Sequence, residues 1–313
     1  MTFIFRRILL SLIVLLLITF LAFSLIHLMP GDPAIIMLGV DTNQEQIDAL
    51  RKSLWLDRPL AVQYGHWLSN AIQGDLGKSV IYREGVTNII ATPLPITIHL
   101  SFIALILSTI LGIGAGIICA IRRGGIQDSV ISVAANIGIA TPVFWLGILG
   151  IYSFGLKLGW LPIQGYTSPF DNFWMSTKQA IMPIICLAIP AVAVIARQTR
   201  SSMLEVIRQD YIRTAWAKGL RERSIVLKHS LKNALIPVVT LLGIQLRTLV
   251  GGAVLVETVF NIPGMGRLLV TSVFNKDFII VQACILIIAV LVLLANMLVD
   301  ISYGWLDPRI RYG

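Results

Sequence analysis

Six long apolar runs constrain the fold of this chain more than any other feature of its sequence. A stretch of about 18 or more apolar residues with few charges is long enough to cross a bilayer as a helix. Only 13% of the residues are charged, about half the share of about 25% that soluble domains carry. The chain is therefore predicted to be an all-α polytopic membrane protein with six transmembrane helices. We expect these helices at about residues 8–29, 98–121, 130–156, 181–196, 235–256 and 278–299.

The first run could also belong to a secretory signal peptide, because Arg6 and Arg7 precede it. However, it is longer than the about 7–15 residues of a signal core, and no small-residue cleavage site follows it. An uncleaved first helix is therefore expected. Pro30-Gly-Asp-Pro33 should end it, because proline cannot continue the hydrogen-bond ladder of a helix.

Prolines interrupt the third and fourth runs, and the second run contains a cluster of glycines. Pro142 interrupts the third run, while Pro183 and Pro190 lie in the fourth. A bilayer tolerates such prolines only where neighbouring helices or polar side chains bond the freed carbonyl. Gly112-Ile-Gly-Ala-Gly116 in the second run predicts a close helix–helix contact, because small residues four positions apart let another backbone approach.

A basic, polar island at residues 197–232 separates the fourth run from the fifth. Such an insert cannot lie in lipid, and loops rich in lysine and arginine stay on the cytoplasmic side. The net charge of +9 follows from this orientation, so it does not indicate nucleic-acid binding. The bases of the island are Arg197, Arg200, Arg208, Arg213, Lys218, Arg221, Arg223, Lys228 and Lys232.

With the island in the cytoplasm, an even number of spans places both termini there too. Residues 1–30 would then form an N-terminal transmembrane helix, and residues 31–95 a folded extracytoplasmic segment. Residues 96–313 would form a transmembrane domain that carries the island as its main cytoplasmic loop. The surrounding bilayer is one expected partner of the chain.

Part of the island predicts a short helix with a defined end. Residues 211–217 contain neither glycine nor proline, and Gly219 can end a helix in a left-handed conformation. Ala215 and Ala217 would leave a low surface on which another protein can dock. A second helix is expected at about residues 222–229. An ordinary basic loop needs the charges but not this order of elements, so we interpret the island as a docking site.

The sequence shows no pattern of a catalytic or metal site. Gly74-Asp-Leu-Gly-Lys-Ser79 looks like the end of a phosphate-binding loop, but Ile72 stands where that motif needs its first glycine. Four histidines are scattered without ligand spacing, and three cysteines lie in apolar segments without a CxxC pair. No nucleophile–base signature occurs. We expect no catalytic residue, metal or cofactor in this chain.

Arg247 lies near the middle of the fifth run, and charges at that depth are functional candidates. It could contact an anionic substrate group in a central pathway, or pair with a polar group on a neighbouring helix or a partner subunit. No carboxylate lies at that depth, whereas proton- or sodium-coupled transporters commonly use one. A self-sufficient secondary transporter stays an alternative, but a chain driven by a partner at the island is favoured.

A series of short motifs occurs in a specific order along nearly the whole chain. They are Pro30-Gly-Asp-Pro-Ala34, Leu56-Asp-Arg-Pro59, Gln63-Tyr64, Trp67-Leu68, Gly74-Asp-Leu-Gly77, Pro142 with Trp145 and Gly147, Leu161-Pro162, Asp210-Tyr-Ile-Arg-Thr-Ala-Trp-Ala-Lys-Gly219, Asn233-Ala-Leu-Ile-Pro237, Glu257-Thr-Val-Phe260, Pro263-Gly-Met-Gly266 and Asp307-Pro-Arg309. Together they resemble the B-type permease subunits of dipeptide, oligopeptide and nickel ABC importers. The ordered set is far more specific than any one fragment.

The resemblance implies the type I importer fold. Two related permeases then form the pathway, two cytoplasmic ATPases drive it, and an extracytoplasmic binding protein delivers the substrate. The chain itself would be a non-catalytic subunit in a bacterial inner membrane. Short peptides are the expected substrate, with nickel chelates and glutathione-like peptides as alternatives within the family.

The resemblance also assigns a role to the island, which is similar to the EAA loop of the family. Arg213, Thr214 and Ala215 stand at the eponymous positions, and the usual Leu-Pro ending is not matched at Leu231-Lys232. Arg247 is not part of the family pattern. The residues expected to couple to the ATPase are Asp210, Tyr211, Arg213, Thr214, Ala215, Ala217, Lys218 and Gly219.

Overall fold

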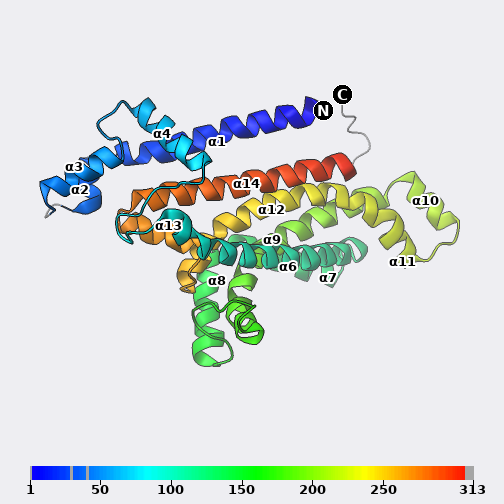
Figure 1. Ribbon diagram of the computed structural model, residues 1–313. Coiled ribbons are helices and arrows are strands. Elements are labelled where there is room, and N and C mark those ends of the chain that lie inside the picture. The colour runs from blue at the N-terminus through cyan, green and yellow to red at the C-terminus, as the bar shows by residue number, and fades with distance from the viewer. Residues whose placement is uncertain (1, 29–30, 40–41, 307–313) are drawn as a thin grey trace. The chain divides into compact units, whose positions relative to one another are not determined.

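The computed structural model describes residues 2–28, 31–39 and 42–306, and this part of the chain is helical almost throughout (Figure 1). Pro30 and the motif Asp307-Pro-Arg309, which contributed to the resemblance, lie outside the described residues. The chain folds into two compact units. The first unit contains residues 98–262 together with the described residues from 294 onward, and the second contains residues 2–97 and 263–293.

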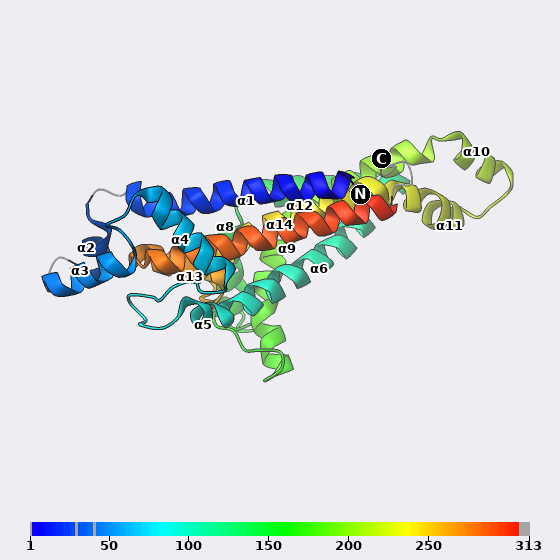
Figure 2. The ribbon, with the colours of Figure 1, turned by 45° about the horizontal axis from the view of Figure 1, so that its top comes forward.

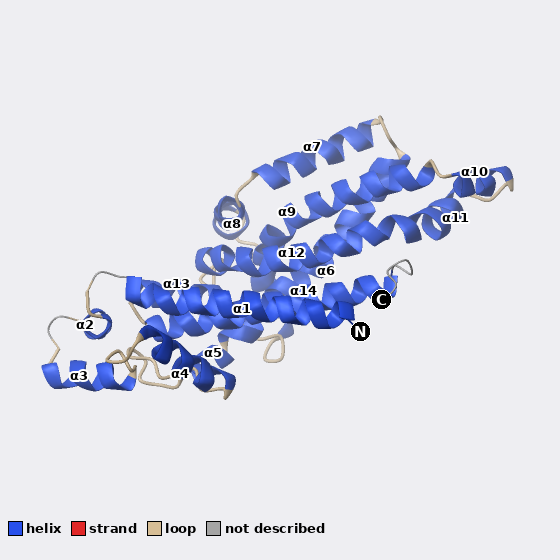
Figure 3. Ribbon diagram, turned by 90° about the horizontal axis from the view of Figure 1, so that it is seen from above, coloured by secondary structure: helices blue, strands red, loops and turns tan. Residues whose placement is uncertain are grey.

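Helix α9 (Phe173–Ile207) is the central element of the first unit. It packs against α7 (Ile126–Ala140), α8 (Val143–Gly150) and α12 (Leu231–Val259), and Figure 3 shows α7, α9 and α12 side by side. Of the residues in its most apolar stretch, 61% are buried. Pro183 and Pro190 lie inside this helix, in a packed environment of the kind that tolerates intramembrane prolines.

Helix α9 continues beyond the predicted fourth span, through Arg197 and Arg200 to Ile207. Polar partners on α7 stabilise this extension. Arg200 forms two hydrogen bonds of 2.8 and 2.9 Å to the carboxylate of Asp128, which is 5% exposed. Arg197 donates a 2.7 Å hydrogen bond to Asn136. The first part of the basic island therefore lies in α9, and the bounds of the cytoplasmic loop stay a prediction.

Helix α6 (Pro93–Ile121) approaches α9 closely at two glycines, as the sequence predicts. A Cβ atom on Gly112 would lie 2.7 Å from Ile195. One on Gly116 would lie 2.6 Å from the carbonyl oxygen of Ala196 and would overlap Thr199. Gly114, between them, would meet nothing within 4 Å. Two of the three glycines are therefore required by the contact, and the third is not.

The third predicted span is broken sharply at Thr141-Pro142. Helix α7 ends at Ala140, and the continuous pair α8 and η1 (Ile151–Lys157, a π-helix) leaves at 101° to it. Proline disfavours helical backbone at the residue before it, and Thr141 has ψ of 123°. The predicted interruption at Thr141-Pro142 is therefore confirmed, and this segment is a broken span or a re-entrant loop.

Four helices of the described chain are long and apolar enough to cross a membrane, and the bent pair raises the number to five. Helix α1 (Thr2–Leu28) is apolar over Leu9–Ser24. The predicted total of six spans stays a prediction. The straight candidates are Val86–Ile121, Phe173–Ile207, Glu222–Val259 and Phe278–Met297.

The second unit combines the start of the chain with a distant segment. Its elements are α1, α2 (Pro33–Leu38), α3 (Gln44–Ser53), α4 (Leu60–Ile72), α5 (Val86–Ala91), α13 (Met265–Phe274) and the first half of α14 (Phe278–Leu306) (Figure 2). The expectation that residues 31–95 are folded is consistent with these helices. The units group residues 263–293 with residues 2–97, so the three predicted parts stay a prediction.

The Gly74–Ser79 motif has a packing explanation. The carboxylate of Asp75 accepts a 2.9 Å hydrogen bond from the backbone of Gly77. Gly77 has a φ of +86°, and a Cβ atom on it would lie 3.0 Å from Ile279. The hydroxyl of Ser79, which is 2% exposed, donates to Asp277 at the start of α14. The glycines thus serve a tight turn that is held against α14.

The Gly-Asp-Pro motif after α1 fixes the next two helices. Asp32 caps α2 by accepting a 2.9 Å hydrogen bond from the backbone of Ala34, and it pairs with Arg51 of α3. The hydrogen bond from Arg51 holds the pKa of Asp32 below its usual value. A lowered folded pKa means that the pair stabilises the fold above the unfolded pKa of about 3.9. This contribution is lost as the pH falls through the folded pKa.

We predict that Gly116→Val destabilises the first unit, because the added side chain would force α6 away from α9. Overpacking of this kind costs about 1–3 kcal/mol. Gly114→Val is the matched control in the same helix, since it has the same chemistry without the steric contact. Thermal unfolding of the purified protein in detergent should give a lower midpoint for Gly116→Val only. Equal midpoints for the two variants would contradict the close packing.

Candidate functional site: the loop between α9 and α12

The loop between α9 and α12 contains a short helix, α10 (Asp210–Ala217), at the predicted place. Asp210 lies in its first turn, where a negative charge favours a helix N-terminus. Arg213 lies 3.6 Å from Asp210 on the exposed side, and Thr214 donates a 3.1 Å hydrogen bond to the carbonyl of Asp210. Figure 1 shows α10 at the far end of α9 and α12 from α8. The helix is therefore presented at one end of the first unit.

One face of α10 packs inward. Ile212 is fully buried, Ala215 is 7% exposed, and both belong to a small apolar cluster with Ile225 and Val206. The sequence analysis assigned Ala215 to the docking surface together with Ala217. In the structure Ala215 lies on the buried face of α10, where its small side chain lets the helix pack closely against Ile225 and Val206. Ala217 is exposed and stays available.

The rest of the surface of α10 is open to the surroundings. Tyr211 is 44% exposed and Trp216 is 49% exposed. Arg213, Thr214 and Lys218 are exposed beside them. Aromatic residues and arginine are enriched at protein–protein interfaces, so this face has the composition of a contact surface. Trp216 lies within the quoted motif, but the sequence analysis did not select it. A tryptophan within a polar, basic segment is the sequence signal that could have identified it.

Gly219 ends α10 in the left-handed conformation that the sequence predicts. Its φ is +73°, and its N–H donates a 2.9 Å hydrogen bond to the carbonyl of Trp216. A Cβ atom at this position would meet nothing within 4 Å. The requirement for glycine is therefore one of backbone conformation alone, which costs other residues about 1–2 kcal/mol.

A polar contact connects α10 to the next membrane helix. The side-chain amide of Asn233, in the first turn of α12, donates a 2.8 Å hydrogen bond to the hydroxyl of Tyr211. Between them lie α11 (Glu222–Ser224) and η2 (Ile225–Ser230), which is a π-helix. The predicted second helix at residues 222–229 is confirmed in position. Most of its length is a π-helix, whose turns are wider than those of an α-helix. Displacement of α10 would act on α12 through this contact.

Arg247 lies on an exposed face of α12, and within the described chain it has no ion-pair partner. Ile244 and Leu255, which are 45% and 50% exposed, lie on the same side of the helix. A pair between Arg247 and another described helix of the same chain is therefore not part of this structure. Of the two interpretations in the sequence analysis, contact with a partner subunit and contact with a pathway stay open.

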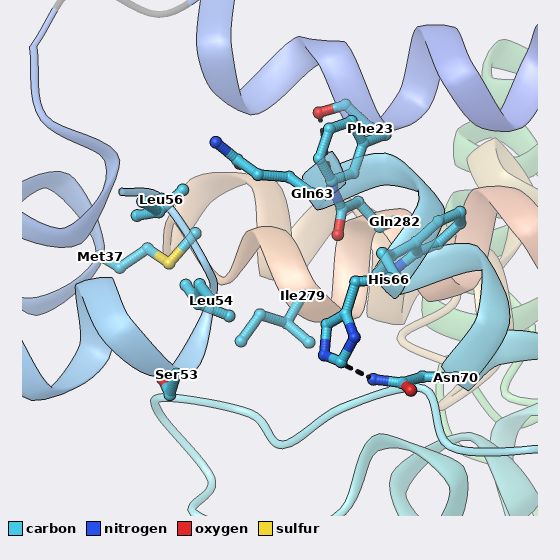
Figure 4. Close-up of a pocket in the computed structure, with 11 residues that line it drawn as sticks. Phe23, Met37, Ser53, Leu54, Leu56, Gln63, His66, Asn70, Ile279 and Gln282 are labelled. Carbon is cyan, nitrogen blue, oxygen red and sulfur yellow. Dashed lines mark hydrogen bonds between the residues drawn. The ribbon is translucent and has the colours of Figure 1, made fainter. Parts of the chain in front are cut away.

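A small pocket lies within the second unit, outside the predicted site residues (Figure 4). It has a volume of about 100 Å³, and its walls come from α1, α4, α14 and the residues after α3. Two amides, Gln63 and Gln282, are 5% and 4% exposed there. His66 stacks on Trp55 with a centroid distance of 4.0 Å and faces Asn70 at 3.2 Å. The space suits one side-chain-sized group with an apolar body and a polar tip.

Part of the sequence pattern is explained by the packing around this pocket. Gln63 donates a 2.7 Å hydrogen bond to the carbonyl of Arg58, which lies within the Leu56–Pro59 motif. Tyr64 forms a 2.8 Å hydrogen bond with Thr19 of α1. Trp67 packs against Phe23. These motif residues therefore attach α4 to α1.

Family models match this chain over most of its length. Residues 112–312 match the binding-protein-dependent transport system inner membrane component. Residues 1–101 match the N-terminal region of the same kind of membrane component. The chain belongs to this family. The resemblance inferred from the ordered motifs is thus confirmed.

Individual relatives agree with the family over the whole chain. A dipeptide transport system permease of Alkalihalophilus pseudofirmus is 40% identical over 327 residues and covers 98% of each chain. A di/tripeptide transport system permease of Pseudomonas aeruginosa is 41% identical over 318 residues and covers 94% of each. A glutathione transport system permease of Escherichia coli is 41% identical over 312 residues, which is 100% of this chain and 99% of the relative.

Solved structures agree with the fold. The membrane chain of the methionine ABC transporter MetNI, in an inward-facing conformation, has a TM-score of 0.55 to this chain at 22% identity. The match covers 70% of this chain and 96% of that one. A membrane chain of an amino acid ABC transporter also has a TM-score of 0.55, at 16% identity. The predicted importer permease fold is therefore confirmed, whereas these structures carry no information on the substrate.

We predict that Gly219→Val weakens the coupling function of the loop without removing the chain from the membrane. A β-branched residue is strained at a φ of +73°, so the end of α10 would shift. Gly219→Asn is the matched control, because asparagine tolerates this conformation. With the partner ATPases co-expressed, Gly219→Val should lower ATPase co-purification or substrate-stimulated hydrolysis. Full activity of Gly219→Val in both assays would contradict the role of this turn.

Proposed function

We propose that this chain is one permease subunit of an ATP-driven ABC importer and forms half of its translocation pathway. The observation that carries the proposal is the exposed, aromatic and basic face of α10, which is held on an apolar support at one end of the first unit. A helix of this kind in a membrane importer subunit suits attachment to a cytoplasmic ATPase. The chain has no chemistry of its own in this function, and ATP hydrolysis belongs to partner subunits.

The proposed assembly has four kinds of component. A second, related permease completes the pathway, two ATPase subunits bind at α10 and its counterpart, and an extracytoplasmic protein delivers the substrate. Family membership supports the need for a binding protein. The bacterial inner membrane is the proposed location, with both termini in the cytoplasm, as the position of the basic loop favours.

Short peptides are the proposed substrate class. Relatives of about 40% identity that transport dipeptides, di/tripeptides and glutathione support this choice. Glutathione-like peptides and nickel chelates are the alternatives within the family. A self-sufficient secondary transporter is the alternative from another class, and it would need no ATPase.

Reconstitution separates the two classes. In liposomes, the chain together with the second permease, the ATPases and the binding protein should import a labelled di- or tripeptide only when ATP is present. The chain alone should import none, even with a proton or sodium gradient. Gradient-driven uptake by the chain alone would contradict the proposal and favour a secondary transporter.

We also propose that Arg247 faces the substrate pathway and contacts the carboxylate of a peptide. An exposed guanidinium in the middle of α12 without a partner in the described chain supports this role. Placing such a charge against lipid costs about 3 kcal/mol on insertion scales, so an aqueous or protein neighbour is expected. Its planar set of donors suits bidentate binding of a carboxylate.

The substitution Arg247→Gln keeps polarity and removes the charge. We predict normal assembly, nearly unchanged basal ATPase activity and reduced transport. The loss should be greater for peptides with a free C-terminal carboxylate than for amidated peptides that the binding protein still accepts. Uptake assays with matched free and amidated peptides test this difference. Equal losses combined with poor assembly would favour a structural pair with the partner permease.

A further inference from the structure

A second feature of the first unit is a groove that the proposed transport function does not use. It lies between the end of α6, the start of α7, and the α11–η2 segment, and it has a volume of about 480 Å³. This is within the range of about 300–1,000 Å³ that is typical of ligand sites. The groove is open to the surroundings on one side. It lies where α6 ends and where the α11–η2 segment begins.

The groove has an apolar floor. Ile118, Ile121 and Leu227 are 43%, 39% and 47% exposed, and they lie on segments long and apolar enough to span a membrane. Ile117 and Val226 complete the floor. An aliphatic chain is the natural neighbour of such a surface at the edge of a bilayer, because burial of apolar surface from water is favourable.

Two arginines stand at the polar end of the same groove. Arg122 directly follows α6, and Arg223 lies in α11. Within the described chain neither side chain has an ion pair or a hydrogen bond, in contrast to Arg200, which is paired with Asp128. Glu222 and Gln127 also line this end. Because this end holds one carboxylate and two guanidinium groups, it has a net positive charge and several hydrogen-bond donors.

We propose that this groove binds one anionic phospholipid, with Arg122 and Arg223 on the phosphodiester and the acyl chain along the isoleucine floor. Arginine forks match phosphate geometry, and basic pockets between membrane helices on the cytoplasmic side suit acidic headgroups. The phosphate and the acyl chain together use both ends of the groove, whereas a free phosphate would leave the floor exposed. The site adjoins η2, the segment that connects α10 to α12, so the lipid also supports the coupling loop.

Binding can be measured on the purified transporter complex with phosphatidylglycerol as the probe. Native mass spectrometry should detect one retained phosphatidylglycerol that phosphatidylcholine does not replace. The double variant R122Q/R223Q should bind it about 30-fold more weakly, since each basic residue at a charged membrane surface contributes about fivefold. The matched control is R123Q/R221Q, which removes the same charge from adjacent exposed positions that do not line the groove. It should retain the lipid.

A second variant separates a lipid from a free phosphate. Ile118→Trp fills the floor and leaves both arginines, so it should displace phosphatidylglycerol, whereas binding of inorganic phosphate would be unaffected by it. Competition by excess inorganic phosphate that matches the lipid would overturn the proposal. So would equal losses in R123Q/R221Q, which would indicate general charge attraction. If R122Q/R223Q instead lowers ATPase co-purification while the lipid is retained, the groove faces that partner and the lipid assignment is wrong.

Discussion

The close contact between α6 and α9 is the constraint on which the first unit depends. Lipid tails are as apolar as the side chains of a membrane helix, so the hydrophobic effect contributes little to helix association. Membrane helices associate through close packing and polar contacts instead. Gly112 and Gly116 supply the first by letting the α6 backbone touch Ile195 and Ala196. Asp128 and Arg200 supply the second between α7 and α9. Helix α9 can therefore carry prolines and charges that a lipid-facing helix could not.

The loop between α9 and α12 also depends on small residues and polar contacts. Ala215 and Ile212 of α10 pack against Ile225, while Tyr211 accepts a hydrogen bond from Asn233 of α12. A helix of eight residues is marginal by itself in water, so this support decides whether it keeps one orientation. The contacts of Ile212, Ala215 and Tyr211 thus hold the exposed face of α10 in place. The π-helix η2 lies directly between the loop and the membrane helix, a position where such turns are often functional.

The second unit is held together by a different set of contacts. Short polar motifs connect segments that are separated along the chain. Ser79 and Asp277 are 198 residues apart and form a buried hydrogen bond. Asp32 and Arg51 fix the turn after α1, and Gln63 and Tyr64 attach α4 to the elements around it. Most of the short motifs in this region thus have a structural explanation.

The sequence by itself determined the class of protein, the approximate place of the membrane helices, the close glycine contact and the left-handed end at Gly219. These follow from local composition and backbone preference, which need no tertiary information. Only the tertiary structure decided that α9 extends to Ile207, that α7 and α8 meet at 101°, and that Ala215 faces inward. Each depends on a partner from another part of the chain, because a charge, a proline or an alanine acquires its role from the group packed against it.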